Sequence, residues 1–287
     1  MALPAETRMG PVHLTVSDLE RSLDYYRKVV GLDVLEQGAG RASLGADSTE
    51  LLRLVEQPGA QPSDGYTGLF HFALLVPDRP SLARWLAHAV RDRVPLTGLS
   101  DHYVSEAIYL RDPDRHGIEI YADRPRELWE GQVGQRMTTE PLDVADLLGQ
   151  ADGESDRLPA GTAMGHVHLK VAAIPETVEF YRDVLGFDLV VERVPQAAFL
   201  SAGGYHHHLG ANTWESAGAR PPPERSAALR HATVVLPSVE ERDEVARRIA
   251  AAGQEPEETP AGPLVRDPSG NALVLTATSA PASAQRQ

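Results

Sequence analysis

A stretch of the chain from His102 to Tyr121 gathers side chains that could do chemistry together. Glu119 lies between two isoleucines, in a run whose alternation is typical of a β-strand. Tyr109 lies ten residues earlier, and the Asp-Pro-Asp turn at 112–114 predicts that it belongs to the preceding strand of a hairpin. A carboxylate among apolar residues is costly to bury unless it is paired or binds a metal. Taken alone, Glu119 is more readily explained as an exposed residue, so its role depends on partners elsewhere.

Two histidines are the candidate partners. His13 stands between Val and Leu, and His71 stands between two phenylalanines. A lone histidine in an apolar run is usually a core residue with its hydrogen bonds satisfied, but these two occupy equivalent positions in repeated modules. Two histidines and one carboxylate with open coordination positions suit non-heme Fe(II), with Mn(II) as the second choice and Zn(II) fitting by ligand type alone. We therefore predict a metal site at His13, His71 and Glu119.

The composition narrows the classes of partner. The chain has 287 residues, of which 42% are hydrophobic, so it is long enough for two packed domains. The formal charge of -14 argues against nucleic acid or an anionic membrane as a partner. There is no cysteine, so a metal would be held by His, Asp or Glu. No signal peptide or long apolar segment is evident, which predicts a soluble, cytoplasmic protein.

The chain also contains an internal repeat. GPVHLTV at 10–16 returns as GHVHLKV at 165–171, and DYYRKVVGLDV from Asp24 returns as EFYRDVLGFDL from Glu179. The offset is 155 residues throughout, as from His13 to His168. Each half divides again into strand, turn and helix followed by further strands. The sequence therefore predicts four modules, which begin near residues 10, 68, 164 and 228.

The first module shows the expected order of elements, β-α-β-β-β. A strand at 12–16 precedes a helix with a capping box at Ser17 and Glu20, and Gly31 is expected to end that helix. Three strands follow, at 32–37, 41–46 and 50–55. One module cannot cover its own sheet, so we expect consecutive modules to pair, giving an α+β fold of two domains with curved mixed sheets around clefts. The predicted units are an N-terminal domain (1–125) with the metal site, a linker (126–162) with a short helix at 142–148, a C-terminal domain (163–277) and a disordered tail (278–287).

Four such modules resemble the vicinal oxygen chelate superfamily, which includes glyoxalases and extradiol dioxygenases. Within it, the chain is similar to extradiol ring-cleaving dioxygenases of the catechol 2,3-dioxygenase type. Their signature runs from a His through an aliphatic-Tyr pair and Asp-Pro to the ligand Glu, and here it runs from His102 through Tyr109 and Asp112 to Glu119. The sequence departs from that signature at Arg115, where the family usually has Gly.

The resemblance implies an Fe(II)-dependent oxidoreductase that cleaves a small aromatic diol with O₂, the iron being held by His13, His71 and Glu119. It implies that His102 acts as acid and base, and that Tyr109 hydrogen-bonds the substrate or the oxygen intermediate. A loop histidine and a core tyrosine are the alternatives for these two. For the whole chain, the alternatives are a glyoxalase-like metal-dependent isomerase or lyase and a small-ligand-binding protein. The sequence leaves the ring substituents and the oligomeric state open.

The second half keeps the histidines and loses the carboxylate. His168 and His231 stand at the positions of the two histidines of the first half, whereas Val274 stands at that of Glu119. We therefore expect no ring cleavage there. His208 follows within a run of three histidines, so His168, His208 and His231 form a candidate three-histidine site, with a metal-free vestigial cleft as the alternative.

Overall fold

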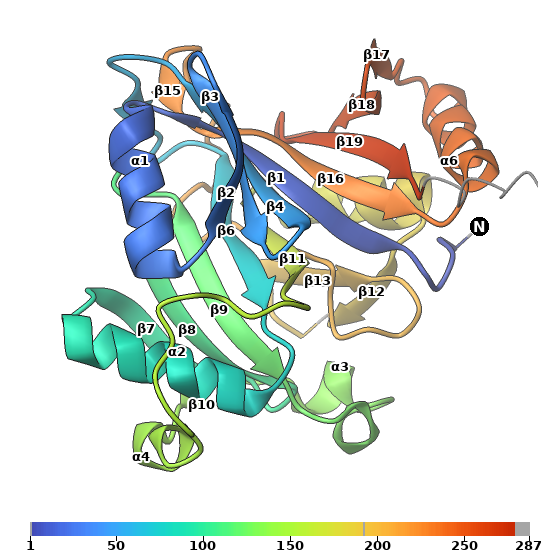
Figure 1. Cartoon of the computed structure of the whole chain (residues 1–287). Coiled ribbons are helices and arrows are strands. Elements are labelled where there is room, and N and C mark those ends of the chain that lie inside the picture. The colour runs from blue at the N-terminus through green and yellow to red at the C-terminus, as the bar shows by residue number, and fades with distance from the viewer. Residues whose placement is uncertain (1, 192, 279–287) are drawn as a thin grey trace, which may run out of the picture.

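The computed structural model describes residues 2–191 and 193–278 (Figure 1). It consists of two large mixed sheets with a few helices on their outer faces, which confirms the predicted α+β class with curved sheets. Apart from residue 278, the predicted disordered tail lies outside the described residues. In the part of the chain that is described, no helix is long and apolar enough to cross a membrane.

The first module follows the predicted order. Its elements are β1 (Arg8–Val16), α1 (Leu19–Tyr25), η1 (Tyr26–Val30), β2 (Asp33–Gly38), β3 (Arg41–Ala46) and β4 (Thr49–Glu56). The helix is capped by the side chain of Asp18 rather than by Ser17, whose hydroxyl donates to Asp114 Oδ1 at 2.6 Å instead. The helix continues as the π-helical turn η1 and ends at Gly31, as predicted, where a φ of 90° requires glycine.

The other modules repeat this order with local variations. The second has β5 (Gln61–Pro62), β6 (Gly68–Leu75), α2 (Arg79–Asp92), β7 (Leu96–Asp101), β8 (Ser105–Arg111) and β9 (Gly117–Asp123). The linker holds η2 (Arg126–Leu128), α3 (Val133–Arg136), β10 (Glu140–Pro141) and α4 (Val144–Leu148), which lies within the predicted linker helix. The third has β11 (Ala163–Lys170), α5 (Ile174–Val178), η3 (Glu179–Leu185), β12 (Asp188–Val191), β13 (Ala197–Ser201) and β14 (Leu209–Asn212). The fourth has β15 (Ser226–Ala227), β16 (Leu229–Leu236), α6 (Val239–Ala251), β17 (Glu257–Thr259), β18 (Gly262–Arg266) and β19 (Ala272–Ala277).

The modules pair differently from the expected consecutive pairing. One sheet has the strand order β17-β18-β19-β16-β1-β4-β3-β2, and the other has β10-β7-β8-β9-β6-β11-β14-β13-β12. Module one therefore joins module four through β1 and β16, and module two joins module three through β6 and β11 (Figure 1). Because the first strands of all four modules offer equivalent edges, the repeat itself does not determine which edges meet. Each sheet consequently contains a module from each half of the sequence.

The core lies between the sheets and their helices. Leu14, Leu52, Phe72 and Ile120, which lie on β1, β4, β6 and β9, are each fully buried and belong to one continuous apolar cluster. Trp85 of α2 is buried in the same cluster, and its indole nitrogen donates to a backbone carbonyl at the end of η1. The helices therefore fix the outer faces of the strands, which leaves the opposite face of the β6–β11 sheet available for polar residues.

A buried ion pair ties the turn before β9 to the first module. His116 Nδ1 lies 2.8 Å from Asp112 Oδ2, and the Tyr26 hydroxyl donates to the same oxygen at 2.9 Å. Burial alone would lower the pKa of His116, but the carboxylates of Asp112 and Asp114 raise it above its usual value. Burial would likewise raise the pKa of Asp112, but His116 holds it below its usual value. His116 and Asp112 are therefore both charged, although both are buried.

This pair predicts a pH dependence of stability that one substitution should remove. In the second half Asn271 stands at the position of His116 and donates to Asp267 Oδ2 at 2.9 Å, so His116→Asn should keep the hydrogen bond without a titrating group. Because the folded-state pKa of His116 is raised, its contribution is complete below a pH of about 6.5 and is lost as the pH rises through the folded pKa. The free energy of unfolding, measured with urea, should therefore fall more between pH 6 and pH 9 for wild type than for the variant. Parallel pH profiles would contradict this account.

Candidate metal centre and its pocket

Strand register brings three metal-binding side chains to one face of the sheet. Ala73 of β6 pairs with Glu119 of β9 on one side and with His166 of β11 on the other. Paired residues point to the same face, and so does His71, which lies two residues before Ala73 on the same strand. The small side chain of Ala73 occupies little of the space between them. The three longer side chains therefore converge above it.

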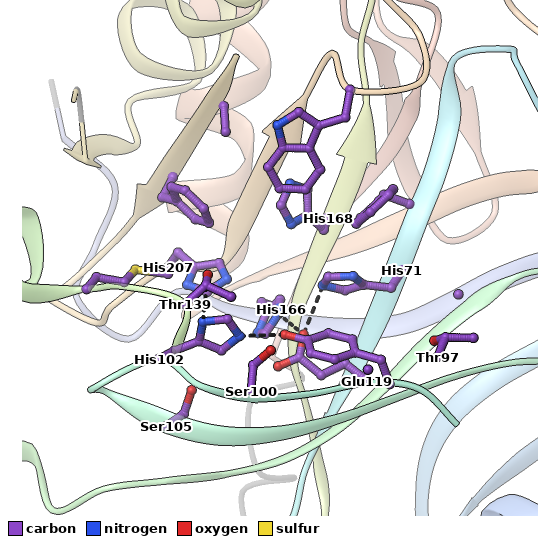
Figure 2. Close-up of a pocket in the computed structure, with 18 of the residues that line it drawn as sticks. His71, Thr97, Ser100, His102, Ser105, Glu119, Thr139, His166, His168 and His207 are labelled. Atoms are coloured by element: carbon purple, nitrogen blue, oxygen red, sulfur yellow. Dashed lines mark hydrogen bonds and ion pairs between the residues drawn. The ribbon is translucent and has the colours of Figure 1, made fainter. Parts of the chain in front are cut away.

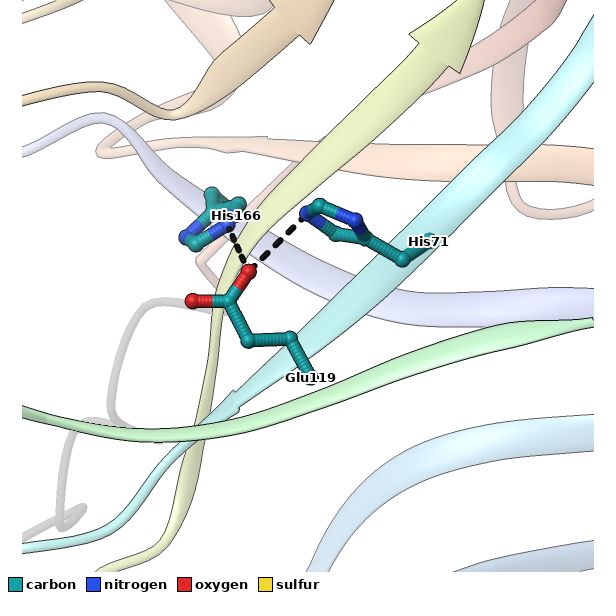
Figure 3. A group of neighbouring side chains, drawn as sticks. All are labelled: His71, Glu119 and His166. Carbon is teal, nitrogen blue, oxygen red and sulfur yellow. Dashed lines mark hydrogen bonds and ion pairs between the residues drawn. The ribbon is translucent and has the colours of Figure 1, made fainter. Parts of the chain in front are cut away.

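The cluster is compact and buried (Figure 3). His71 Nε2 lies 3.0 Å from Glu119 Oε2, and His166 Nε2 lies 3.1 Å from the same oxygen. The candidate ligand atoms all lie within 4.8 Å of one another. His71, Glu119 and His166 are exposed by only 5%, 2% and 2% respectively, so bulk water does not solvate them. Two imidazole nitrogens and one carboxylate aimed at a common point form a ligand set that a divalent cation fits.

The electrostatics of the cluster agree with that fit. Burial alone would raise the pKa of Glu119, but the neighbouring His166 and His71 hold it well below its usual value. Burial lowers the pKa of His166, which favours the neutral imidazole that metals bind. His71 Nε2 is buried, and its close polar neighbour among the described residues is the Glu119 carboxylate, to which it makes no well-aligned hydrogen bond. A divalent cation would compensate the buried carboxylate and use the lone pair of this nitrogen.

The predicted ligand His13 is not part of this cluster. It lies on β1 in the other sheet, where it pairs in register with His231 and the two ring centroids are 3.9 Å apart. The reason is the module pairing, since module two faces module three and not module one. His166 takes the third position instead, where the first half has Pro11. The sequence did carry a signal for it, because His166 and His168 alternate within one predicted strand and so share a face.

The second predicted site is not assembled either. His168 lies on β11 in one sheet and His231 lies on β16 in the other. His208 Nδ1 accepts from the backbone N–H of Ala202 at 3.2 Å. Val274 of β19 pairs with Thr233 in the β1–β16 sheet, as Glu119 pairs with Ala73 in the other. Among the described residues, His71, Glu119 and His166 are the one group with metal-binding geometry.

The predicted pair His102 and Tyr109 does lie beside the cluster. Tyr109 on β8 pairs with Glu119 on β9, so it shares the ligand's face. His102, in the loop after β7, has Nε2 at 2.7 Å from the Tyr109 hydroxyl and Nδ1 at 2.7 Å from the backbone carbonyl of Thr138. Burial and the Glu119 carboxylate raise the pKa of Tyr109 well above its usual value, so its hydroxyl stays protonated. With the three residues of the cluster, His102 and Tyr109 form one continuous polar group of five side chains.

This group forms the floor of a cavity of about 550 Å³ (Figure 2). Aromatic and aliphatic side chains form much of the remaining wall, among them Phe70, Phe199, Trp214, Val191 and Met137. Such a mixture suits a small, largely apolar ligand with a few polar groups. The cavity also receives His207, which was not predicted as a site residue and whose ring centroid lies 4.1 Å from that of His166.

Sequence and structure comparisons agree with this fold. The chain belongs to the glyoxalase/bleomycin resistance protein/dioxygenase superfamily, whose family model matches residues 8–120 and 163–275. It is 44% identical over 276 residues to the catechol-2,3-dioxygenase of Bacillus subtilis (strain 168), which covers 94% of this chain and 96% of that relative. The crystal structure of glyoxalase I from Zea mays superposes with a TM-score of 0.58 at 17% identity, covering 94% of this chain and 92% of that one. The latter similarity concerns the fold.

The structure predicts which histidine substitution removes metal binding. His166→Ala takes away one of three converging ligands, so stoichiometric binding of Fe(II) or Mn(II), about one ion per chain, should fall to near background. His13→Ala, an equivalent change in the other sheet, should leave the metal content unchanged. Metal analysis after anaerobic reconstitution and desalting measures both. Loss of metal from His13→Ala with retention in His166→Ala would overturn the assignment.

Proposed function

We propose that this protein is an extradiol ring-cleaving dioxygenase that acts on a catechol-type aromatic diol with O₂. Fe(II) is the proposed cofactor, with Mn(II) as the alternative, and His71, His166 and Glu119 are its proposed ligands. The observation that carries the proposal is the His102–Tyr109 pair, hydrogen-bonded at 2.7 Å directly beside the three ligands. The 44% identical relative, a catechol-2,3-dioxygenase of Bacillus subtilis, supports the same reaction.

The donor set suits this metal and this reaction. Two imidazoles and one carboxylate leave coordination positions open, which is the pattern of non-heme Fe(II) oxygenases. When bound, such an ion would lower the pKa of the diol hydroxyls and supply one-electron chemistry toward O₂. The apolar walls of the cavity, including Phe70 and Phe199, would hold the flat ring and limit access of bulk water.

The role of His102 follows from its two hydrogen bonds. The carbonyl of Thr138 can only accept, so His102 Nδ1 donates to it, and in the neutral imidazole Nε2 is left as an acceptor. The Tyr109 hydroxyl therefore donates to Nε2. In this arrangement His102 can take a proton from a diol hydroxyl and return one later, since imidazole is suited to both near neutral pH. The Tyr109 oxygen can in turn accept a hydrogen bond from a diol hydroxyl, so the proton can pass from the diol through Tyr109 to His102 Nε2.

An oxygen-uptake assay tests the function directly. Protein reconstituted anaerobically with Fe(II) should consume O₂ with catechol and form a yellow ring-opened product, followed by absorbance. A glyoxalase-like isomerase or lyase would bind the metal but consume no O₂, since O₂ is not a substrate of such reactions. That chemistry also does not need the His102–Tyr109 pair. A binding protein would neither require metal nor turn over. Absence of both O₂ uptake and colour across a panel of catechols, with iron bound, would exclude the proposed reaction.

His102→Phe should separate proton transfer from metal binding. A positioned acid–base typically contributes about 10²–10⁴-fold in rate, so turnover should fall by roughly that factor. Iron content should stay at the wild-type level, because His102 is not a proposed ligand. Stopped-flow absorbance of the ring-opened product, at matched iron content, measures the change. His13→Phe is the control for replacing a histidine outside the cavity, and equal turnover of wild type and His102→Phe would remove His102 from the mechanism.

A further inference from the structure

A chain of side chains leads from the surface to the wall of the cavity. Asp123, the last residue of β9, has a side chain that is 24% exposed, and its Oδ1 lies 2.9 Å from His206 Nε2. His206 Nδ1 lies 2.8 Å from His207 Nδ1. His207 lines the cavity and packs against the ligand His166. None of these three residues serves as a metal ligand in the cluster.

His206 is held rigidly in the middle of this chain. Its side chain is fully buried, and aromatic rings surround it, with centroids at 4.0 Å for Tyr205, 5.6 Å for Trp129 and 6.1 Å for Tyr121. The hydroxyls of Tyr121 and Tyr205 lie 2.8 Å apart, which connects β9 to the loop before β14. Such packing leaves the imidazole of His206 little freedom to rotate.

The carboxylate sets the direction of the hydrogen bonds. An ionised Asp123 can only accept, so His206 Nε2 carries the hydrogen that it donates. In neutral His206 the other nitrogen, Nδ1, is then an acceptor, and His207 Nδ1 must donate to it. Because Nδ1 of His207 is used in this way, Nε2 is the ring nitrogen left for a ligand, and it bears a lone pair rather than a hydrogen.

We propose that Asp123 and His206 are positioning residues that fix the tautomer of His207, so that its Nε2 accepts a hydrogen bond from a hydroxyl of the bound diol. In metal sites and catalytic sites, the hydrogen-bond partner of one histidine ring nitrogen commonly determines whether the other nitrogen carries a hydrogen. This inference rests on the proposed function for the identity of the ligand. The tautomer itself depends only on this chain.

Nitrogen NMR of the protein tests the tautomer without any turnover. In zinc-loaded or metal-free protein labelled with ¹⁵N-histidine, the shifts of His207, assigned by comparison with His207→Gln, should show a hydrogen on Nδ1 and a bare Nε2. Asp123→Asn keeps the size of the side chain but offers His206 Nε2 both an amide donor and a carbonyl acceptor, which should remove the preference that holds the hydrogen of His207 on Nδ1. A wild-type protein with the hydrogen on Nε2 of His207 overturns the proposal by itself.

Kinetics with matched variants test the consequence. At equal iron content, Asp123→Asn should lower kcat by roughly 10- to 100-fold, the usual effect of removing a residue that orients a site histidine. Asp123→Glu should restore most of the rate, since it returns an accepting carboxylate. Asp64→Asn, which removes the same charge from a surface ion pair with Arg115, should have no such effect.

The outcomes distinguish the inference from the proposed function. Wild-type kcat in Asp123→Asn, or an equal loss in Asp64→Asn, overturns the positioning role while leaving the dioxygenase proposal intact. Absence of turnover in every protein, with iron bound, removes the dioxygenase proposal, and the NMR result then still decides the tautomer. If Asp123→Asn does not fold, as judged by circular dichroism, the wild-type spectrum and Asp123→Glu remain decisive.

Discussion

The antiparallel pairing of β6 with β11 is the contact on which the site depends. It sets Ala73 opposite His166 and thereby brings an imidazole from the third module to the His71 and Glu119 of the second. His207 approaches His166 within the third module, from the loop before β14, the strand that pairs with β11 on its other side. A shift of this register by one residue would turn His166 to the other face of the sheet and break the ligand set. The chemistry therefore relies on long-range strand pairing more than on any single loop.

The part of the site that the sequence could predict lies within one hairpin. Tyr109, the turn at 112–114 and Glu119 are close in sequence, so strand alternation and turn length determine that Tyr109 and Glu119 pair across the hairpin. His71 was also predicted, because it stands at the position in the second module that matches His13 in the first. The four modules and their element order followed from the repeat and were confirmed. These features depend on local patterns, which sequence periodicity reports directly.

The part that could not be predicted depends on which edges meet. His13 and His168 stand in matching motifs, and His13 would have faced His71 if the modules had paired in sequence order. In the structure His168 pairs with His71 instead, and its neighbour His166 joins the cluster. Periodicity predicts which face of a sheet a residue occupies but not which strand lies beside it. The neighbouring strand is determined by packing between segments that are far apart in the sequence. The run of three histidines at 206–208 poses the same problem at close range. Only its backbone path shows that His206 and His207 form a connected pair while His208 turns to Ala202.

The crossed pairing of modules also bears on how such a chain could have arisen. A polypeptide with one half of this sequence could rebuild these sheets only by associating with a second copy of itself, and both clefts of that dimer would then be identical. Covalent fusion ends this requirement, because each cleft is encoded by its own residues. Pro11 and Val274 can then occupy the positions of His166 and Glu119 without harm to the other cleft. Duplication in this fold thus allows the residues of one cleft to change while the other cleft keeps the residues that its chemistry needs.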